Sequence, residues 1–231
     1  MHKLKEQLQK LADPARAKVS RRFFKTGKGE YGEGDIFIGL TVPQARTLAR
    51  EFSGLSLREV QKLLSSKIHE ERLVALLILV HNFARGSEAA KKTIYEFYLK
   101  STRFINNWDL VDLSAPKIVG EYLLDKDKRV LSRLARSKNI WERRIAIVST
   151  YSFIRNDRFS EMLRIAELLL RDEHDLIHKA VGWMLREVGK RDFAAERRFL
   201  EKHYRKMPRT MLRYAIEKFS PNLQGHFLGR S

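Results

Sequence analysis

The chain has 231 residues, 43% of them hydrophobic, so it can bury a sizeable core and does not have the composition of a disordered chain. Lys and Arg outnumber Asp and Glu by 46 to 28, and the resulting net charge of +18 predicts a polyanionic partner, because basic side chains displace the counterions condensed on phosphates. The chain has no cysteine, which excludes disulfides, thiolate metal sites and cysteine nucleophiles.

The N-terminal segment predicts two helices followed by a loop. Residues 2–12 are amphipathic, and Asp13-Pro14 predicts the start of a second helix that ends near Phe24, since Asp is a good capping residue and Pro suits the first helical position. Residues 25–35 contain four glycines and are predicted to form a glycine-rich loop.

The rest of the chain also predicts helices. One opens at Val42-Pro43 and ends near residue 52, and Ser56 with Glu59 predicts a capping box for the next short helix. Apolar residues then recur at helical spacing over residues 69–85, 88–100, 107–124, 128–136, 139–154, 158–171, 175–190, 192–206 and 208–219. No run alternates apolar and polar residues as a strand does, so the predicted fold class is all-α.

These helices also repeat. Alanine recurs at one helical position, at Ala75, Ala146, Ala180 and Ala215, which stand 71, 34 and 35 residues apart by subtraction of their positions. The first interval is close to two periods of about 35 residues, which places a missing copy near Val111-Asp112. The pattern is typical of an α-solenoid of paired helices, and we expect a single curved domain over residues 1–231 with a basic concave face.

Residues 107–112 contain the strongest candidate site. Trp108 and Asp112 lie four positions apart on a predicted helix and therefore share one face. Asp109 suits the ordinary role of a carboxylate in the first turn, where it favours the helix dipole. Asp112 lies about one turn further in, at the register where the other repeats have a small apolar residue. Because buried carboxylates are rare unless paired or used, we predict a functional role for Asp112.

Two further tryptophans are present. Core packing is the commoner role of a large aromatic residue, and we predict it for Trp141, which opens a helix of the repeat. For Trp183 two interpretations stay open. It packs between repeats, with Gly182 beside it allowing another backbone to approach, or it forms a flat apolar wall together with Trp108.

Arginine residues supply candidate phosphate contacts. Arg143 and Arg144 are adjacent within a helix of the repeat, and such a pair is usually solvated or salt-bridged, but on a concave face it is suited to bind phosphate. Further basic residues would extend this surface: Arg133, Arg136, Lys138, Lys190, Arg191, Arg197, Arg198, Arg205, Lys206 and Arg209. Together they favour contact with a nucleic-acid backbone.

Two other motif matches are rejected. Residues 27–32 read Gly-Lys-Gly-Glu-Tyr-Gly, the dinucleotide-binding pattern, but they follow a predicted helix and no βαβ unit surrounds them. His174 and His178 have the spacing of two metal ligands on one helix, but they lack the glutamate of the metalloprotease motif and an evident third ligand. We therefore expect no metal and no cofactor, and no serine triad motif or phosphate-binding loop is present.

Three blocks carry a family resemblance. They are Trp-Asp-Leu-Val-Asp at 108–112, Trp-Glu-Arg-Arg-Ile-Ala-Ile at 141–147 and Ala-Val-Gly-Trp-Met-Leu-Arg-Glu at 180–187. In this order the chain resembles the bacterial DNA alkylation repair proteins of the AlkD family, which are alkylpurine DNA glycosylases built from HEAT-like repeats. The resemblance runs with consistent spacing from about Phe23 to Phe219.

The resemblance implies roles for individual residues. It places the catalytic aspartate at Asp112, the two wall-forming tryptophans at Trp108 and Trp183, and the phosphate-contacting arginine at Arg144. These four residue types are retained, in contrast to relatives that lose the aromatic pair and are inactive or bind DNA structures. Phe23 corresponds to a tyrosine near the substrate in one family member, so the hydroxyl of that tyrosine is missing here.

The function implied by the resemblance is hydrolysis of the N-glycosidic bond of cationic alkylated purines, such as 3-methyladenine and 7-methylguanine, in duplex DNA. It further implies no base flipping, and we expect an abasic site as the product. One rival is a non-catalytic solenoid that binds distorted or branched DNA; charge and repeats fit it equally well, and only Asp112, Trp108 and Trp183 favour the enzyme. A second rival, a protein-binding scaffold, leaves the charge of +18 unexplained.

The sequence also leads to expectations about membrane association, oligomeric state and localisation. The chain has no apolar run of about 18 residues, no signal peptide and no lipidation motif, so we expect no association with membranes. We expect a monomer that acts in the cytoplasm, associated with the nucleoid, on double-stranded DNA containing alkylated purines.

Overall fold

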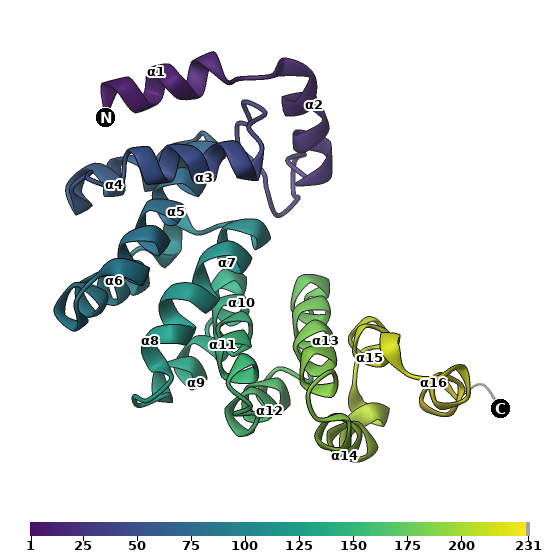
Figure 1. Cartoon of the computed structure of the whole chain (residues 1–231). Helices are drawn as coiled ribbons and strands as arrows, with labels where there is room; N and C mark the ends of the chain where they lie inside the picture. Colours follow the sequence, from purple (N-terminus) through teal and green to yellow (C-terminus); the bar gives the residue numbers. More distant parts are fainter. Residues whose placement is uncertain (230–231) are drawn as a thin grey trace. The chain divides into compact units, whose positions relative to one another are not determined.

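The computed structural model describes residues 1–229, and helices account for most of them (Figure 1). Within this part of the chain there is no β-strand, only an isolated bridge between Ile36 and Ile68, so the all-α prediction is confirmed. No helix of the described residues is long and apolar enough to cross a membrane. The chain divides into two compact units, Met1–Ile118 (unit 1) and Val119–Ser231 (unit 2). The single domain over 1–231 stays a prediction.

Unit 1 contains seven α-helices among its described residues. They are α1 (His2–Lys10), α2 (Pro14–Phe23), α3 (Val42–Glu51), α4 (Leu57–Leu64), α5 (His69–Arg85), α6 (Glu88–Lys100) and α7 (Trp108–Ala115), with a 3-10 turn at Thr102–Phe104. α5 contacts α3, α4, α6 and α7. It is therefore the helix on which the others of unit 1 are assembled.

Capping side chains determine where several of these helices begin. Asp13 accepts the backbone N–H of Arg16 at 3.0 Å, with Pro14 at the first position of α2. Ser56 and Glu59 form the predicted capping box of α4, since each side chain accepts the backbone N–H of the other residue. These local bonds satisfy N–H groups that the first helical turn leaves without partners.

A buried carboxylate holds the segment that leads into α3. Glu70, at the start of α5, is 2% exposed and accepts the backbone N–H groups of Ile38, Gly39 and Leu40 at 3.1, 2.7 and 3.3 Å. Gly39 has a φ of +89°, and an added Cβ would lie 2.2 Å from the carbonyl oxygen of Asp13. Only glycine fits this close approach between the segment and the start of α2.

Unit 2 continues the helical pattern. Its α-helices are α8 (Glu121–Leu123), α9 (Arg129–Ala135), α10 (Ile140–Ser149), α11 (Tyr151–Arg155), α12 (Ser160–Leu168), α13 (Asp175–Gly189), α14 (Phe193–His203), α15 (Arg209–Ala215) and α16 (Pro221–Leu228), with 3-10 turns at Tyr204–Lys206 and Ile216–Lys218. α10 contacts α13, which contacts α15, while α12 contacts α9. The series α10, α13 and α15 contains the predicted alanine positions of this unit.

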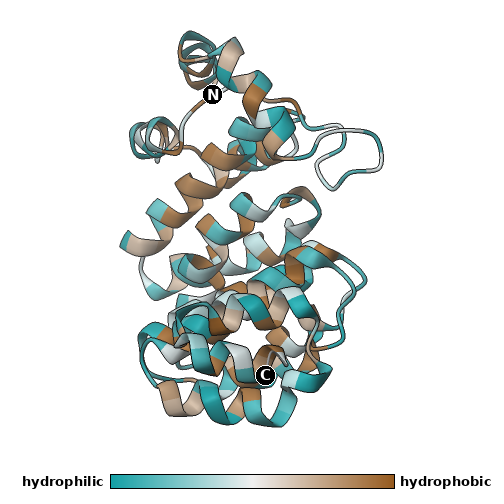
Figure 2. Cartoon of the chain, turned by 90° about the vertical axis from the view of Figure 1, so that its right-hand side faces the viewer, coloured by the Kyte–Doolittle hydropathy of each residue, from teal (hydrophilic) through white to brown (hydrophobic). Residues whose placement is uncertain are grey.

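The alanine register is buried, as the repeat predicts. The four alanines at positions 75, 146, 180 and 215 are all 0% exposed. The fifth register position is occupied by Val111, which is also 0% exposed, and not by Asp112, which is half-buried. Figure 2 shows hydrophobic and hydrophilic stretches on the same helices, as expected where one face of a helix is buried and the other meets solvent.

The predicted continuous helix over residues 107–124 is interrupted. A π-helical segment, Pro116–Gly120, follows α7 and precedes the short α8. Pro116 has no N–H, so the α-helical hydrogen bond to the carbonyl of Asp112 cannot form, and the wider π turn accommodates this break. Gly120 ends the segment where an added Cβ would lie 2.3 Å from the carbonyl oxygen of Ser149.

Candidate active site on helix α7

α7 presents the tryptophan and the aspartate of the strongest sequence motif. Asn107 caps the helix, and its Oδ1 accepts the backbone N–H of Trp108 at 2.8 Å. Trp108 and Asp112 are the first and fifth residues of α7, so their side chains lie on one side of the helix, and both are half-buried. The side chains are thus anchored on a regular element and still reach solvent.

Aromatic rings from α2 and the following loop support Trp108. The Phe24 ring stacks on the indole with centroids 5.2 Å apart and planes inclined by 23°. Phe37 stacks on the Phe24 ring at 5.0 Å. Phe23 meets the indole edge-on at 5.7 Å and is itself 62% exposed. The structure therefore brings the predicted Phe23 and Trp108 together, whereas sequence reasoning missed Phe24 and Phe37.

A buried tyrosine, Tyr98, lies close enough to Asp112 to be influenced by its charge. The hydroxyls of Tyr98 and Ser114 are 2.9 Å apart, and the Ser114 hydroxyl donates to the carbonyl of Leu110, so the Tyr98 hydroxyl is the donor in the first contact. Burial raises the pKa of Tyr98 well above its ordinary value; the Ser114 bond opposes this rise, and the negative charge of Asp112 adds to it. Tyr98 is therefore a fixed neutral donor in unit 1.

Asp109 of the sequence motif joins ionisable side chains from outside it in a buried network beside Trp108. His69 Nε2 lies 2.8 Å from Asp109 Oδ2, and His69 Nδ1 lies 3.4 Å from Asp35 Oδ2. Asp35 also contacts Arg72 Nη2 at 2.6 Å and accepts a hydrogen bond from Asn106 Nδ2 at 3.2 Å.

The first turn of α5 has an unusual sequence that could have indicated this network. Its first four residues, at positions 69–72, are all ionisable, yet each is 4% exposed or less. Four such residues ahead of a long apolar run are unlike the polar face of a surface helix, since charged side chains are rarely buried unless they are paired.

In unit 2, Trp183 is half-buried on α13. Its Nε1 donates to Glu187 Oε1 at 3.2 Å, and its ring lies 6.0 Å from that of Tyr151. An added Cβ on Gly182 would lie 2.4 Å from the carbonyl oxygen of Met211, which confirms that this glycine allows a close backbone approach, here from α15. The predicted core position of Trp141 is confirmed at 7% exposure.

The two predicted arginines of α10 both bond within unit 2. Arg143 is paired with Asp172 through Nε at 2.6 Å and Nη2 at 3.4 Å, and its Nη1 donates to the carbonyl of Ser137 at 3.0 Å. Arg144 is 5% exposed, and its Nη1 donates to the carbonyl of Leu176 at 2.6 Å. Arg143 is therefore salt-bridged, as one member of an arginine pair usually is.

The histidines with metal-ligand spacing have structural partners instead. His174 caps α13, and its Nδ1 accepts the backbone N–H of Leu176 at 3.1 Å. His178 Nε2 contacts the carbonyl oxygen of Asp172. Among the described residues, no group of three or more His, Asp or Glu side chains is placed to hold a metal ion.

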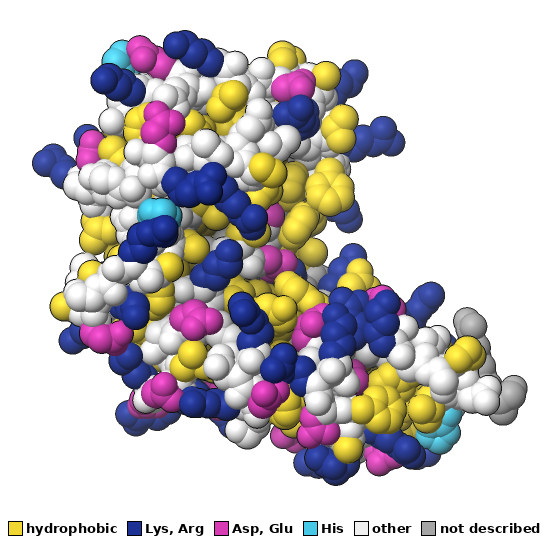
Figure 3. Space-filling view, viewed as in Figure 1, with side chains coloured by type: hydrophobic (Ala, Val, Ile, Leu, Met, Phe, Trp, Pro, Cys, Tyr) yellow, Lys and Arg dark blue, Asp and Glu magenta, His cyan; other side chains and the backbone are white. Residues whose placement is uncertain are grey.

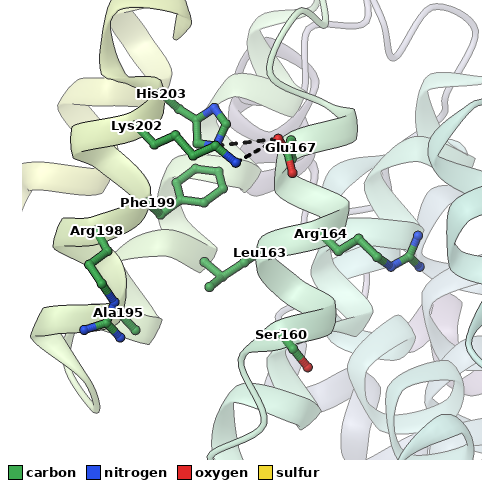
Figure 4. Close-up of a pocket in the computed structure, with 9 residues that line it drawn as sticks. All are labelled: Ser160, Leu163, Arg164, Glu167, Ala195, Arg198, Phe199, Lys202 and His203. Carbon is green, nitrogen blue, oxygen red and sulfur yellow. Dashed lines mark ion pairs between the residues drawn. The ribbon is translucent and has the colours of Figure 1, made fainter.

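Basic side chains are widespread on the face shown in Figure 3, with acidic ones among them. A distinct hollow of about 390 Å³ lies between α12 and α14 of unit 2, where Glu167 lies 3.7 Å from both Lys202 Nζ and His203 Nε2 (Figure 4). Arg198 also lines it, whereas neither Trp183 nor Arg144 does. The hollow is therefore separate from the predicted site residues of unit 2.

Comparisons with known proteins agree with the resemblance. A family model described as DNA alkylation repair enzyme matches residues 4–219. Among solved structures, the chain is similar to one described as a predicted DNA alkylation repair enzyme from Enterococcus faecalis, with a TM-score of 0.70, 16% identity, and coverage of 91% of this chain and 97% of that chain. At this identity the likeness shows the fold. No curated protein sequence matches the chain.

Proposed function

The chain belongs to the family of DNA alkylation repair enzymes, and on that premise we propose that it is a monofunctional DNA glycosylase. The substrates are cationic alkylated purines, such as 3-methyladenine and 7-methylguanine, in duplex DNA, and the product is an abasic site. The observation that carries the proposal is the pairing of a half-buried indole and a half-buried carboxylate, Trp108 and Asp112, on one side of α7.

One carboxylate is enough for this reaction. A cationic purine is already an activated leaving group, so no general acid has to protonate it, whereas most glycosidases acting on neutral sugars use two carboxyl groups. The bond between C1′ of the deoxyribose and the purine nitrogen breaks, and its electron pair neutralises the purine. Asp112 stabilises the positive charge that develops on the sugar and orients the water that attacks C1′. The proton that this water loses passes to the solvent.

The remaining site residues bind and position the DNA. Trp108 and Trp183 pack against the sugar-phosphate backbone around the lesion, and Phe23 extends the apolar surface beside Trp108. Arg144 holds a phosphate, with Arg143 as a second basic group beside it. Arg143 pairs with Asp172 within unit 2, so binding a phosphate through Arg143 would have to compete with this ion pair.

Selectivity in this proposal comes largely from the lesion. Without flipping the base into a closed pocket, the enzyme relies on the charge and lability of the alkylated purine. Neutral lesions are therefore poor substrates. Removal of a neutral lesion at a rate comparable to that of 7-methylguanine would contradict this part of the proposal.

The decisive experiment is single-turnover release of 7-methylguanine from a duplex by the wild type and by Asp112→Asn. We expect the substitution to lower the rate by at least about 100-fold while DNA affinity is unchanged, because it removes one preorganised electrostatic group at the reacting centre. Asp157→Asn is the matched control, since Asp157 is an exposed carboxylate of unit 2 that pairs with Arg191. The control should keep the wild-type rate.

The other outcomes identify the rival functions. No release by either protein, together with tight and strongly salt-dependent binding of both to duplex or branched DNA, would identify a non-catalytic DNA-binding protein. Binding that barely weakens between low and moderate salt would exclude both DNA functions and leave a protein-binding scaffold. The glycosylase proposal also includes a monomeric protein that acts in the cytoplasm.

A further inference from the structure

His69 occupies an unusual position for a histidine that no motif singled out. It is the first residue of α5, is 2% exposed, and has a carboxylate oxygen against each ring nitrogen, from Asp109 at 2.8 Å and from Asp35 at 3.4 Å. A neutral imidazole has one N–H and one lone pair, so it would turn a lone pair towards one carboxylate. Only the imidazolium can donate to both.

The charge balance of the network leads to the same protonation state. The two buried carboxylates of Asp35 and Asp109 face one guanidinium, that of Arg72, which is 4% exposed. With a neutral His69 these groups would carry one uncompensated negative charge in a buried place, which is costly. Protonation of His69 brings their net charge to zero.

Other charged groups near the network lie on α5 itself and on the solvent side of Asp35 and Arg72. Glu70 accepts backbone N–H groups of the segment before α3, and Glu71 lies 3.2 Å from Lys5 Nζ. On the solvent side of Asp35 and Arg72, an open cavity of about 300 Å³ is lined by Glu33, Lys67 and Arg103, one acidic and two basic residues.

The same imidazole ring joins three elements of unit 1. It stacks on Phe37 with centroids 4.4 Å apart and lies 5.2 Å from the ring of Phe24, which itself stacks on Trp108. The backbone N–H of His69 donates to the carbonyl of Ile36 at 2.8 Å. Through Asp109 it also contacts the first turn of α7. One side chain therefore connects the end of α2, the loop before α3 and α7.

We propose that His69 is a positioning residue for the α7 site: clamped as an imidazolium between Asp35 and Asp109, it fixes Trp108 and thereby the helix that carries Asp112. His69 does not touch the substrate, because it is buried behind Phe24 and Asp109. The inference rests on the proposed function and adds His69 as a residue that determines the geometry of the site. A small displacement of a reacting group is sufficient to lower a rate by about 100-fold.

The network gives this role a pH dependence. Burial opposes the charge on His69, but the charge and hydrogen bond of Asp109 and the bond to Asp35 outweigh burial and raise the pKa of His69 to about 8, with Arg72 acting in the opposite direction. The ordinary pKa is 6.5, so the stabilising contribution is complete below about pH 6.5 and is lost as the pH rises through 8. The site should therefore loosen on the alkaline side.

The first test observes the histidine ring directly. In an NMR titration of the full chain, the His69 signal is identified by its loss in His69→Gln, and we expect both ring nitrogens to carry protons at pH 7 and one proton to leave near pH 8. Asp109→Asn should move this step to lower pH, because it removes the charge that raises the pKa. A His69 ring that is neutral at pH 7 would overturn the proposal.

The second test follows Trp108. The difference between the fluorescence of the wild type and that of Trp108→Phe isolates the indole signal of α7, and we expect a step near pH 8 that is absent in His69→Gln. A Trp108 signal that is the same in His69→Gln as in the wild type would show that His69 does not fix the indole. Neither this test nor the titration requires catalysis, so both decide the inference even if the wild type releases no base and the glycosylase proposal fails.

The third test measures single-turnover release of 7-methylguanine. We expect His69→Gln to be about 10- to 100-fold slower at unchanged DNA affinity and to lose the decline in rate near pH 8. His81→Gln is the matched control, since His81 lies on the same helix outside the network and should keep the wild-type rate and profile. A folded His69→Gln with the wild-type rate and profile would overturn the proposal. If His69→Gln does not fold, Asp109→Asn provides the same comparison through its shifted profile.

Discussion

Glu70 illustrates how a single buried carboxylate can organise a backbone. It accepts three consecutive N–H groups, from Ile38, Gly39 and Leu40, in a segment that belongs to no helix or strand. A buried N–H without a partner costs free energy comparable to a lost hydrogen bond, so the carboxylate replaces the partners that regular structure would supply.

We therefore expect Glu70→Gln to destabilise the protein by about 1–3 kcal/mol, because the amide presents one acceptor oxygen and places an NH₂ group against backbone donors. Urea unfolding of the full chain measures the change. Glu96→Gln is the control, since the side chain of Glu96 is 49% exposed and lies 4.0 Å from Lys92 Nζ on the same helix; it should change stability by less than about 0.5 kcal/mol. Equal effects of the two substitutions would contradict the claim that Glu70 stabilises the protein by accepting the N–H groups of residues 38–40.

For individual residues, the sequence predicted which site residues share a helix. It did not predict contacts between residues that are far apart in the sequence. Trp108 and Asp112 are four positions apart, so helical geometry alone places them together. His69 meets Asp35 and Asp109, which lie 34 and 40 positions away in the sequence. Each of these three residues looks unremarkable by itself, and only the packing of α5 against α7 and the loop makes them a network.

The helices α13 and α15 approach each other closely at Gly182. An added Cβ there would lie 2.4 Å from the carbonyl oxygen of Met211 and 2.5 Å from Cβ of Tyr214. Neither atom is the end of a flexible side chain, so the two helices would have to separate. Trp183 is the next residue, and its position on α13 depends on this contact.

Gly182→Ala should therefore destabilise the protein by about 1–3 kcal/mol through overpacking, even though alanine favours a helix over glycine by about 1 kcal/mol. Thermal or urea unfolding measures the net effect. Gly54→Ala is a suitable control, because Gly54 is exposed and an added Cβ there would have no neighbour within 4 Å. A stabilised Gly182→Ala protein would show that helix propensity outweighs the close approach.

Apolar periodicity and capping residues were sufficient to predict the helices from the sequence. They were not sufficient to predict where the helices are interrupted. The capping box of α4 was predicted from Ser56 and Glu59 because it is local. The π-helical segment after α7 was not, although Pro116 lay inside the predicted helix. Proline in a helical pattern indicates a break or a kink, but the form of the break depends on the neighbouring backbone, here that of Ser149 against Gly120.

For the whole molecule, the net charge of +18 makes DNA affinity depend strongly on salt. We expect Arg144→Ala to weaken binding and to reduce the slope of log affinity against log salt by about 0.9, the loss of one phosphate contact. Arg198→Ala removes the same charge from the hollow between α12 and α14 and should change the slope much less. Equal slopes for the two variants, measured by fluorescence anisotropy across a salt series, would assign Arg144 a purely structural role through its bond to Leu176.

α7 has only eight residues, which is too short for a helix to persist in water by itself. Its conformation is supplied by its neighbours, so the geometry of the proposed chemistry is encoded partly at residues 24, 35, 37 and 69, none of which belongs to the helix. We therefore expect these positions to be constrained together with Trp108 and Asp112 in evolution. A lineage that abandons catalysis is free to change all of them, and one that keeps it must exchange them in compatible sets.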